Sequence, residues 1–132
     1  MAVPDEVRAR ILERVRKDWP DDFAMQKYTL DKQLEAYLEF HRFYGSLEPS
    51  DFVDGIFSKA LAEWPDDYDM QLHTATRQLE AAIDLFQYQD PRVPGEVLEA
   101  IRSKAFSDWP DDYDMQLHTL KDQVSAWLSL NG

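Results

Sequence analysis

Apolar residues recur at intervals of four in three segments of the chain. They are Val7, Ile11 and Val15, then Phe52, Ile56 and Ala60, then Val97, Ile101 and Ala105. A step of four keeps side chains on one face of a helix, so each segment is predicted to be an amphipathic helix of about three to four turns. A proline precedes each segment, and the residue after it is the expected N-cap: Asp5, Ser50 and Gly95.

A Trp-Pro pair closes each of these helices. Proline disfavours the helical conformation at the residue before it, so the helices are predicted to end at Trp19, Trp64 and Trp109. The next residues, Asp21, Asp66 and Asp111, are the expected N-caps of a second set of helices, with Asp22, Asp67 and Asp112 in the first turn. These second helices are predicted to run from about Asp22 to Phe40, Asp67 to Phe86 and Asp112 to Leu130. Gly45 with Pro49 is expected to end the first copy.

The two sets of helices belong to a repeat of 45 residues. The stretch Trp64–Thr74 returns letter for letter as Trp109–Thr119, and more loosely as Trp19–Thr29. The repeat units are 3–47, 48–92 and 93–132. A single helical hairpin of this size cannot bury its apolar stripe, whereas stacked hairpins can. We therefore predict an all-α protein, a single domain over 1–132, in which three αα-hairpins form a small solenoid or a compact helical bundle.

The composition narrows the classes of function. Aspartate and glutamate number 26 against 14 lysines and arginines, which disfavours binding to a nucleic-acid backbone. The chain has no cysteine, no apolar run of the ~18 residues that a membrane span needs, and no apolar segment typical of a signal peptide at its start. We expect a soluble, cytoplasmic protein that binds neither nucleic acid nor membrane and has no cofactor.

The tryptophans and aspartates of the Trp-Pro-Asp-Asp segments have structural explanations. A large ring at the joint between two helices is expected to pack in the core and cover both of them. The paired aspartates are expected to cap helices. Neighbouring side chains at a helix start point about 100° apart, which is a poor arrangement for chelating one ion.

Uncharged polar residues form a stripe on each second helix. Gln26, Thr29, Gln33 and Ala36 follow steps of three, four and three, which places them on one face. The candidate binding residues of this stripe are Gln26, Thr29, Gln33, Gln71, Thr74, Gln78, Gln116, Thr119 and Gln123. The favoured interpretation is that the amides satisfy backbone groups at the joints or between repeats. The alternative is a groove of amides that binds a peptide backbone or a polar ligand.

Histidine and aspartate occur together in two of the repeats. His73 follows Asp69 by four residues, and His118 follows Asp114 by four, so each pair shares a helix face. A surface ion pair within each helix explains this spacing. The alternative is a metal site of Asp69, His73, Asp114 and His118, which would suit a metal- or small-ligand-binding protein or a hydrolase.

The two ends of the chain suggest an interaction surface. The first helix carries Arg8, Arg10, Arg14, Arg16 and Lys17, and the last carries Trp127, Leu128 and Leu130 with little charge nearby. No phosphate-binding glycine loop or nucleophile motif is present. We therefore expect a non-enzymatic helical-repeat protein whose partner is another protein or a second copy of itself. The remaining alternative is an acidic mimic of nucleic acid.

Overall fold

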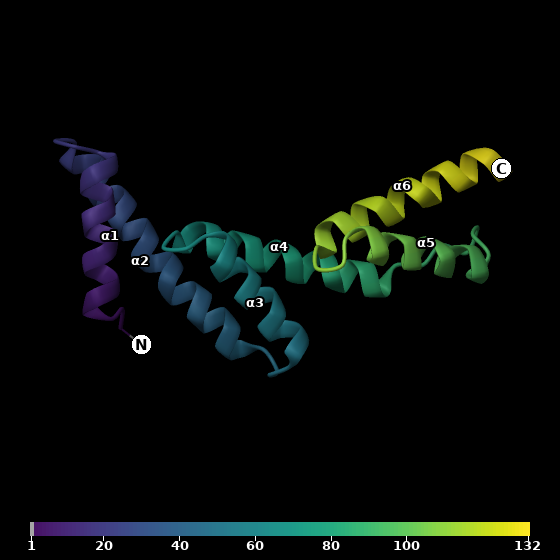
Figure 1. Cartoon of the computed structure of the whole chain (residues 1–132), viewed down its shortest axis with the longest axis horizontal. Helices are drawn as coiled ribbons and strands as arrows, with labels where there is room; N and C mark the ends of the chain where they lie inside the picture. The colour runs from purple at the N-terminus through teal and green to yellow at the C-terminus, as the bar shows by residue number, and fades with distance from the viewer. Residues whose placement is uncertain (1) are drawn as a thin grey trace. The chain divides into compact units, whose positions relative to one another are not determined.

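The computed structural model describes residues 2–132, and its secondary structure there is entirely helical (Figure 1). The helices are α1 (Asp5–Asp18), α2 (Phe23–Ser46), α3 (Asp51–Glu63), α4 (Tyr68–Gln87), α5 (Gly95–Asp108) and α6 (Tyr113–Asn131). The predicted all-α fold class is confirmed. None of these helices combines the length and the apolar composition that crossing a bilayer requires.

The starts of α1, α3 and α5 follow two different capping schemes. Ser50 is the N-cap of α3, as predicted, and its hydroxyl accepts a hydrogen bond from the Val53 N–H at 3.0 Å. For Asp5 and Gly95 the prediction was wrong, because both lie inside their helices and the N-caps are Pro4 and Pro94. The two prolines have extended ψ angles of 145° and 144°, which turn the chain into the helix without a side-chain cap.

The joints after α1, α3 and α5 place the cap one residue later than predicted. The C-caps of these helices are Trp19, Trp64 and Trp109, at the positions where the helices were expected to end. The N-caps of the following helices, however, are Asp22, Asp67 and Asp112, whose carboxylates accept hydrogen bonds from the N–H three residues on. Asp21 and Asp66 instead lie in the left-handed region, at φ 60° and 62°. Aspartate tolerates that conformation, so it completes the turn and leaves the cap to its neighbour.

The tryptophan side chains at these joints are not part of the buried core, which corrects the prediction. Trp19, Trp64 and Trp109 keep 39%, 37% and 40% of their surface exposed. What each joint uses is the backbone of the tryptophan: its N–H bonds back to the preceding helix, for example from Trp19 to the Val15 oxygen at 2.9 Å.

Helix α2 continues about one and a half turns beyond its predicted end at Phe40. It passes through Gly45 to Ser46, and no glycine has a positive φ, so Gly45 does not act as a stop. Three rings near the end of α2 pack on Phe57 of α3, with centroid distances of 5.1 Å for Phe40, 5.5 Å for Phe43 and 5.2 Å for Tyr44. The contacts of Phe43 and Tyr44 with Phe57 stabilise the extra turns. Helices α4 and α6 end within a residue of their predicted ends, at Gln87 and Asn131.

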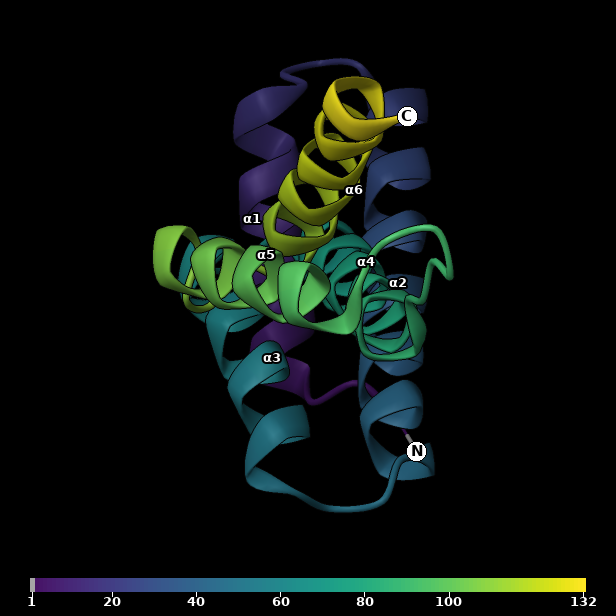
Figure 2. The same ribbon diagram turned by 90° about the vertical axis from the view of Figure 1, so that its right-hand side faces the viewer.

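The chain divides into two compact units, Met1–Ala75 and Thr76–Gly132, with the boundary inside α4. In the first unit α1 packs against α2 (Figures 1 and 2). The core of this unit contains the predicted stripe of α1 together with residues of α2 and the first residue of α4. Its buried members are Val7, Ile11, Val15, Leu30, Ala36 and Tyr68.

In the second unit α5 packs against α6 (Figures 1 and 2). The core residues come from the second half of α4, the following loop, α5 and α6: Ala81, Leu85, Val93, Ile101, Leu117, Leu120 and Val124. Arg102 of α5 reaches the end of α4, where its guanidinium donates to the Leu85 oxygen at 2.7 Å and to the Tyr88 oxygen. It thereby satisfies carbonyls that a helix C-terminus leaves without partners.

Candidate functional site

The first glutamine of each predicted stripe binds the joint of its own repeat. The Nε2 atoms of Gln26, Gln71 and Gln116 donate to the tryptophan carbonyl seven residues earlier, at 2.8, 2.8 and 2.6 Å. Gln71 and Gln116 are only 2% and 3% exposed. These amides therefore satisfy backbone oxygens at the ends of α1, α3 and α5, which matches the structural interpretation of the stripe.

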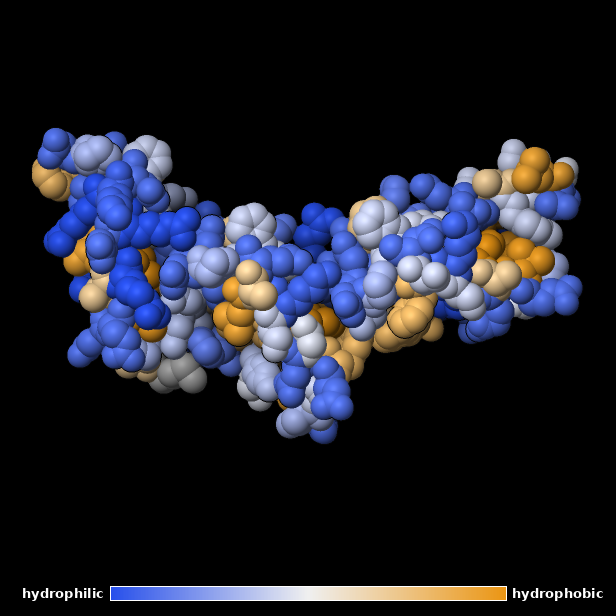
Figure 3. Space-filling model, viewed as in Figure 1, coloured by the Kyte–Doolittle hydropathy of each residue, from blue (hydrophilic) through white to orange (hydrophobic). Residues whose placement is uncertain are grey.

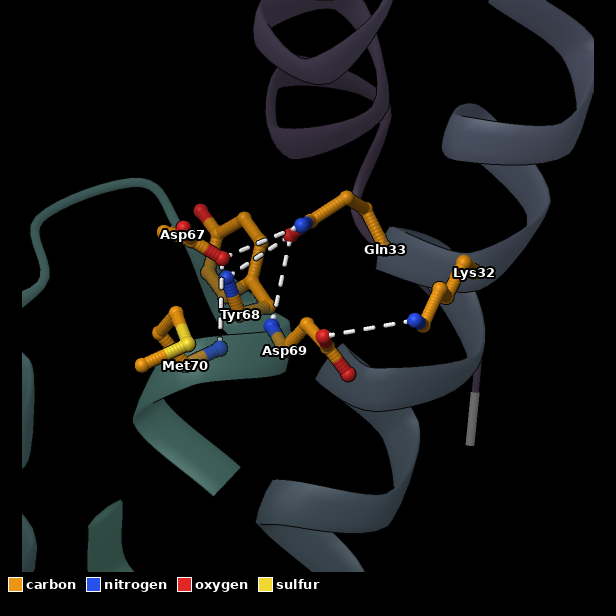
Figure 4. A network of polar contacts seen from close by, with 6 residues as sticks. All are labelled: Lys32, Gln33, Asp67, Tyr68, Asp69 and Met70. Atoms are coloured by element: carbon orange, nitrogen blue, oxygen red, sulfur yellow. Dashed lines mark hydrogen bonds and ion pairs between the residues drawn. The ribbon is translucent and has the colours of Figure 1, made fainter. Parts of the chain in front are cut away.

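The second glutamine of the stripe binds the following repeat. Gln33 of α2 lies against the start of α4 (Figure 4). Its Oε1 accepts hydrogen bonds from the backbone N–H of Tyr68 at 2.8 Å and of Asp69 at 3.4 Å, and its Nε2 donates to the Asp67 carboxylate at 3.1 Å. The Asp67 carboxylate also accepts from the Met70 N–H at 3.2 Å. Gln33 and Asp67 together satisfy three of the N–H groups that a helix start leaves without partners. We call this contact the first seam.

An ion pair and an aromatic pair accompany the amide in the first seam. The Lys32 ammonium lies 3.7 Å from the Asp69 carboxylate (Figure 4), with the two side chains 52% and 41% exposed. The Tyr37 ring meets the Tyr68 ring edge-on at a centroid distance of 5.1 Å. Tyr68 is only 7% exposed, so the ring burial outweighs the solvent-screened ion pair as a stabilising contact.

Arg10 of α1 also contacts the start of α4. Its guanidinium lies 3.8 Å from the Asp66 carboxylate. The hydrogen bond and charge interaction with the Tyr68 side chain, and to a smaller extent the negative charge of Asp66, raise the pKa of Arg10 above its ordinary value. The charged arginine thus connects the basic α1 to the first seam.

A second seam repeats these bonds 45 residues further along the chain. Gln78 of α4 accepts from the Tyr113 N–H at 2.8 Å and donates to the Asp112 carboxylate at 3.0 Å. Arg77 pairs with Asp114 at 2.9 Å, in the positions that correspond to Lys32 and Asp69. The same donor and acceptor positions thus join α2 to α4 and α4 to α6.

The third copy of the amide is Gln123 of α6. The side chain is exposed, and the structure pairs its amide with no residue within 2–132. Leu130 on the same helix is 84% exposed, whereas its counterparts Phe40 and Leu85 are 3% and 5% exposed. We call the surface formed by Gln123, Ala126, Trp127 and Leu130 the α6 face.

The complementary half of a seam is exposed at the start of α2. Phe23 occupies the position of Tyr68 and Tyr113 and is 73% exposed, against 7% for Tyr68. Asp22 is the N-cap of α2, and its carboxylate accepts a hydrogen bond from the Met25 N–H at 3.1 Å. The backbone N–H groups of Phe23 and Ala24, which correspond to those that Gln33 binds, have no acceptor within the described residues. We call Asp22, Phe23, Ala24 and Lys27 the α2 start.

The aspartates of the predicted histidine pairs have other partners. Asp69 and Asp114 bind Lys32 and Arg77, so the expected ion pair within each helix is wrong. His118 lies 3.3 Å from Asp122 instead, with both side chains about two thirds exposed. No group of three or more histidine, aspartate and glutamate side chains in residues 2–132 is arranged to hold a metal ion.

The remaining predicted site residues lie at or near these contacts. Thr29, Thr74 and Thr119 are partly buried beside the amides. Trp127 and Leu128 are partly buried and pack against the core of the second unit, while Leu130 projects into solvent. The bases of the seams, Lys32 and Arg77, were missed in the sequence, and Asp69 and Asp114 were given histidine partners instead. The bases could have been found by comparing the positions at which the repeats differ.

A surface hollow beside α2 and α3 offers little chemistry. It is lined by Phe40, His41, Tyr44, Asp54 and Phe57, among others. The Tyr44 hydroxyl donates a hydrogen bond to the Asp54 carboxylate, which raises the pKa of Tyr44. The phenol is therefore protonated at neutral pH and is not an activated nucleophile.

Comparison with known proteins gives no relative from which a function can be carried over: the chain matches no protein-family model, no curated protein and no solved structure.

Proposed function

We propose that the chain is a non-enzymatic helical-repeat protein, built from three helical hairpins in series, that binds another protein through the α6 face. The observation that carries the proposal is the exposure of this face. Leu130 is 84% exposed, although the equivalent side chains of α2 and α4 are buried. Hydrophobic atoms reach the surface at the end of α6, near the C-terminus marked in Figure 1 (Figure 3). Apolar side chains that gather in one exposed patch mark surfaces at which proteins interact.

The contacts of the two seams support this proposal over the metal-binding alternative. A metal site would need the carboxylates of Asp69 and Asp114, and both are engaged by basic side chains of the preceding repeat. The amides at 33 and 78 hold backbone N–H groups, so they are not free to read a peptide. The amide of Gln123 has no such partner within residues 2–132 and the side chain of Leu130 is exposed, so both can contact a bound protein.

Affinity capture with matched variants tests the proposal. The baits are the wild-type chain, Leu130→Asp and Phe106→Asp. Leu130 and Phe106 are both exposed apolar residues in the last turn of a helix, with exposures of 84% and 61%, so the two substitutions place the same charge in similar surroundings. We expect a protein that wild type and Phe106→Asp retain and Leu130→Asp loses. Identical captured proteins for all three baits would refute binding through the α6 face.

A further inference from the structure

We propose that the protein which covers the α6 face is a second copy of this chain, docked by its α2 start. The contact would be a third seam, formed between copies with the same geometry as the two seams within the chain. This inference rests on the proposed function and names its partner. Four observations carry it: the unpaired amide, the free helix start, the aromatic residues on both sides and the charges around them.

The hydrogen-bonding groups of the two surfaces complement each other. In both internal seams one glutamine accepts from the first N–H of the following helix and donates to the N-cap aspartate. The α6 face supplies that glutamine as Gln123. The α2 start supplies the aspartate as Asp22 and the free N–H as that of Phe23. Because Asp22 already holds the capping geometry of Asp67 and Asp112, the receiving surface is formed before docking.

The aromatic residues of the two surfaces also match. Trp127 follows Gln123 by four residues, as Tyr37 follows Gln33. In the first seam the Tyr37 ring meets Tyr68, and the residue that corresponds to Tyr68 in the α2 start is the exposed Phe23. Docking would therefore place Trp127 against Phe23, and it would bury the exposed Phe23 ring together with the part of Trp127 that the core leaves accessible. Aromatic anchors of this kind contribute most of the affinity of many interfaces.

The charges are exchanged relative to the internal seams. The internal seams have a base at Lys32 and Arg77. The corresponding residue beside the α6 face is the acid Asp122. On the other side, the α2 start has Ala24 where the internal seams have an aspartate.

One turn further on, the α2 start carries Lys27 where the other repeats have leucine. The third seam therefore pairs Asp122 with Lys27. Both residues are engaged only in exposed ion pairs of their own helices, with His118 and Asp31, and such pairs are weak enough to exchange partners. The exchanged charges favour the contact between the α6 face and the α2 start over a contact in which either surface replaces its counterpart in an internal seam.

The proposed contact joins two different surfaces, so it is head-to-tail. Each copy offers one α6 face and one α2 start, and both can be used at once. Association of this type continues until a ring closes or grows as an open chain. The alternative is that a different protein with a similar helix start binds the α6 face.

Sedimentation velocity over a concentration series of the purified chain tests the proposal. We expect the average sedimentation coefficient to rise with concentration for wild type and for the control Phe106→Asp. Leu130→Asp removes the α6 face and Phe23→Asp removes the α2 start, and each should weaken association by at least about thirtyfold. Both residues are exposed, so the variants should fold, which circular dichroism checks. A wild-type chain that stays monomeric at all concentrations, or association that neither variant weakens, overturns the proposal.

Mixing the two variants gives a sharper result. Leu130→Asp keeps an intact α2 start and Phe23→Asp keeps an intact α6 face, so an equimolar mixture should form a dimer that grows no further. If α6 instead paired with α6 of a second copy, Phe23→Asp would associate alone and the mixture would give no new species. That outcome overturns the head-to-tail contact.

A charge exchange tests the proposed register. Ala24→Asp and Asp122→Arg should each weaken association, the first by placing two aspartates together and the second by facing Lys27 with an arginine. The double variant recreates the acid and base of an internal seam and should recover at least wild-type affinity. Strictly additive losses in the double variant would overturn the register.

The capture experiment separates failure of this inference from failure of the proposed function. If wild type is monomeric and Leu130→Asp loses an unrelated protein in capture, the α6 face binds a protein other than itself and only the inference falls. If wild type is monomeric and all baits capture the same proteins, both fall.

Discussion

Replacement of Gln33 by methionine isolates the contribution of the first seam to stability. Methionine keeps the length and most of the volume of glutamine, so packing beside Tyr68 is largely retained. The substitution removes the acceptor of the Tyr68 N–H at 2.8 Å and the donor to the Asp67 carboxylate at 3.1 Å. The third contact, to Asp69 at 3.4 Å, is long enough to be left out of the total.

The expected loss follows from these two bonds. A neutral hydrogen bond contributes about 1 kcal/mol net, and one to a charged group about 1.5 kcal/mol or more. Leaving a partly buried helix N–H without an acceptor adds to the cost, so Gln33→Met should lower the free energy of unfolding by about 2–3 kcal/mol. For a chain of this length that corresponds to a decrease in Tm of roughly 7–10 °C.

Gln123→Met is the matched control. It is the same substitution at the equivalent position of α6, where the amide has no partner within the described residues, and it should change stability by less than about 0.5 kcal/mol. Urea unfolding measures both variants, at a protein concentration at which sedimentation velocity shows a monomer. Equal stability of Gln33→Met and Gln123→Met would refute the assignment of Gln33 as the bond that joins successive repeats.

Three further substitutions test other parts of the structure. Asp67→Ala should cost about 2 kcal/mol in urea unfolding and Asp22→Ala only about 1, because the first carboxylate holds both its own helix start and the amide of the preceding repeat; equal costs would contradict this. Gly55→Ala should stabilise the chain by about 0.5–1 kcal/mol, since an added methyl group meets nothing within 4 Å and φ is not positive; a lower Tm would contradict the helical environment. Hydrogen bonds from the side chain and then the backbone of Arg92 lower the pKa of Asp90, so this carboxylate contributes stability above its ordinary pKa that is lost as the pH falls through the lowered value. Arg92→Met should raise the pKa of Asp90 in an NMR titration, and an unchanged pKa would exclude the pairing.

The helices could be predicted from the sequence because their signals are local. The spacing of Val7, Ile11 and Val15 identified the buried face of α1, and the Trp-Pro pairs identified where α1, α3 and α5 end. The end of α2 could not be predicted in this way. Gly45 is a helix stop by local preference, but three aromatic contacts with Phe57 across the chain outweigh that preference.

The choice between adjacent aspartates was also beyond local reasoning. Asp21 and Asp22 are equally good N-caps by residue type. Which of them caps the helix depends on which adopts the left-handed conformation in the joint, and the structure assigns that to Asp21. The backbone of the preceding tryptophan adds a constraint, because the Asp22 N–H bonds to the Trp19 oxygen at 3.2 Å.

The sequence predicts the kind of group that the glutamines of the stripe bind, but not which residues supply it. Identical spacing in the three repeats showed that the amides of Gln26 and Gln33 serve some recurring purpose, but spacing along one helix does not show which helix lies opposite. The structure assigns the two amides different tasks: Gln26 holds a carbonyl of its own joint, and Gln33 holds the start of a helix 35 residues away.

Positions at which the repeats differ carry the most specific information about association. Asp69 and Asp114 each lie opposite a base of the preceding repeat, and the equivalent residue of the first repeat is the uncharged Ala24. At the equivalent of those two bases the third repeat has Asp122. If the seam positions of the first and third repeats only faced solvent, any polar residue would be compatible with the fold, and neutral residues would suffice in both repeats. An acid on one side and the Lys27 ammonium on the other instead form an opposite-charge pair that differs from both internal seams, as a selective contact between copies requires.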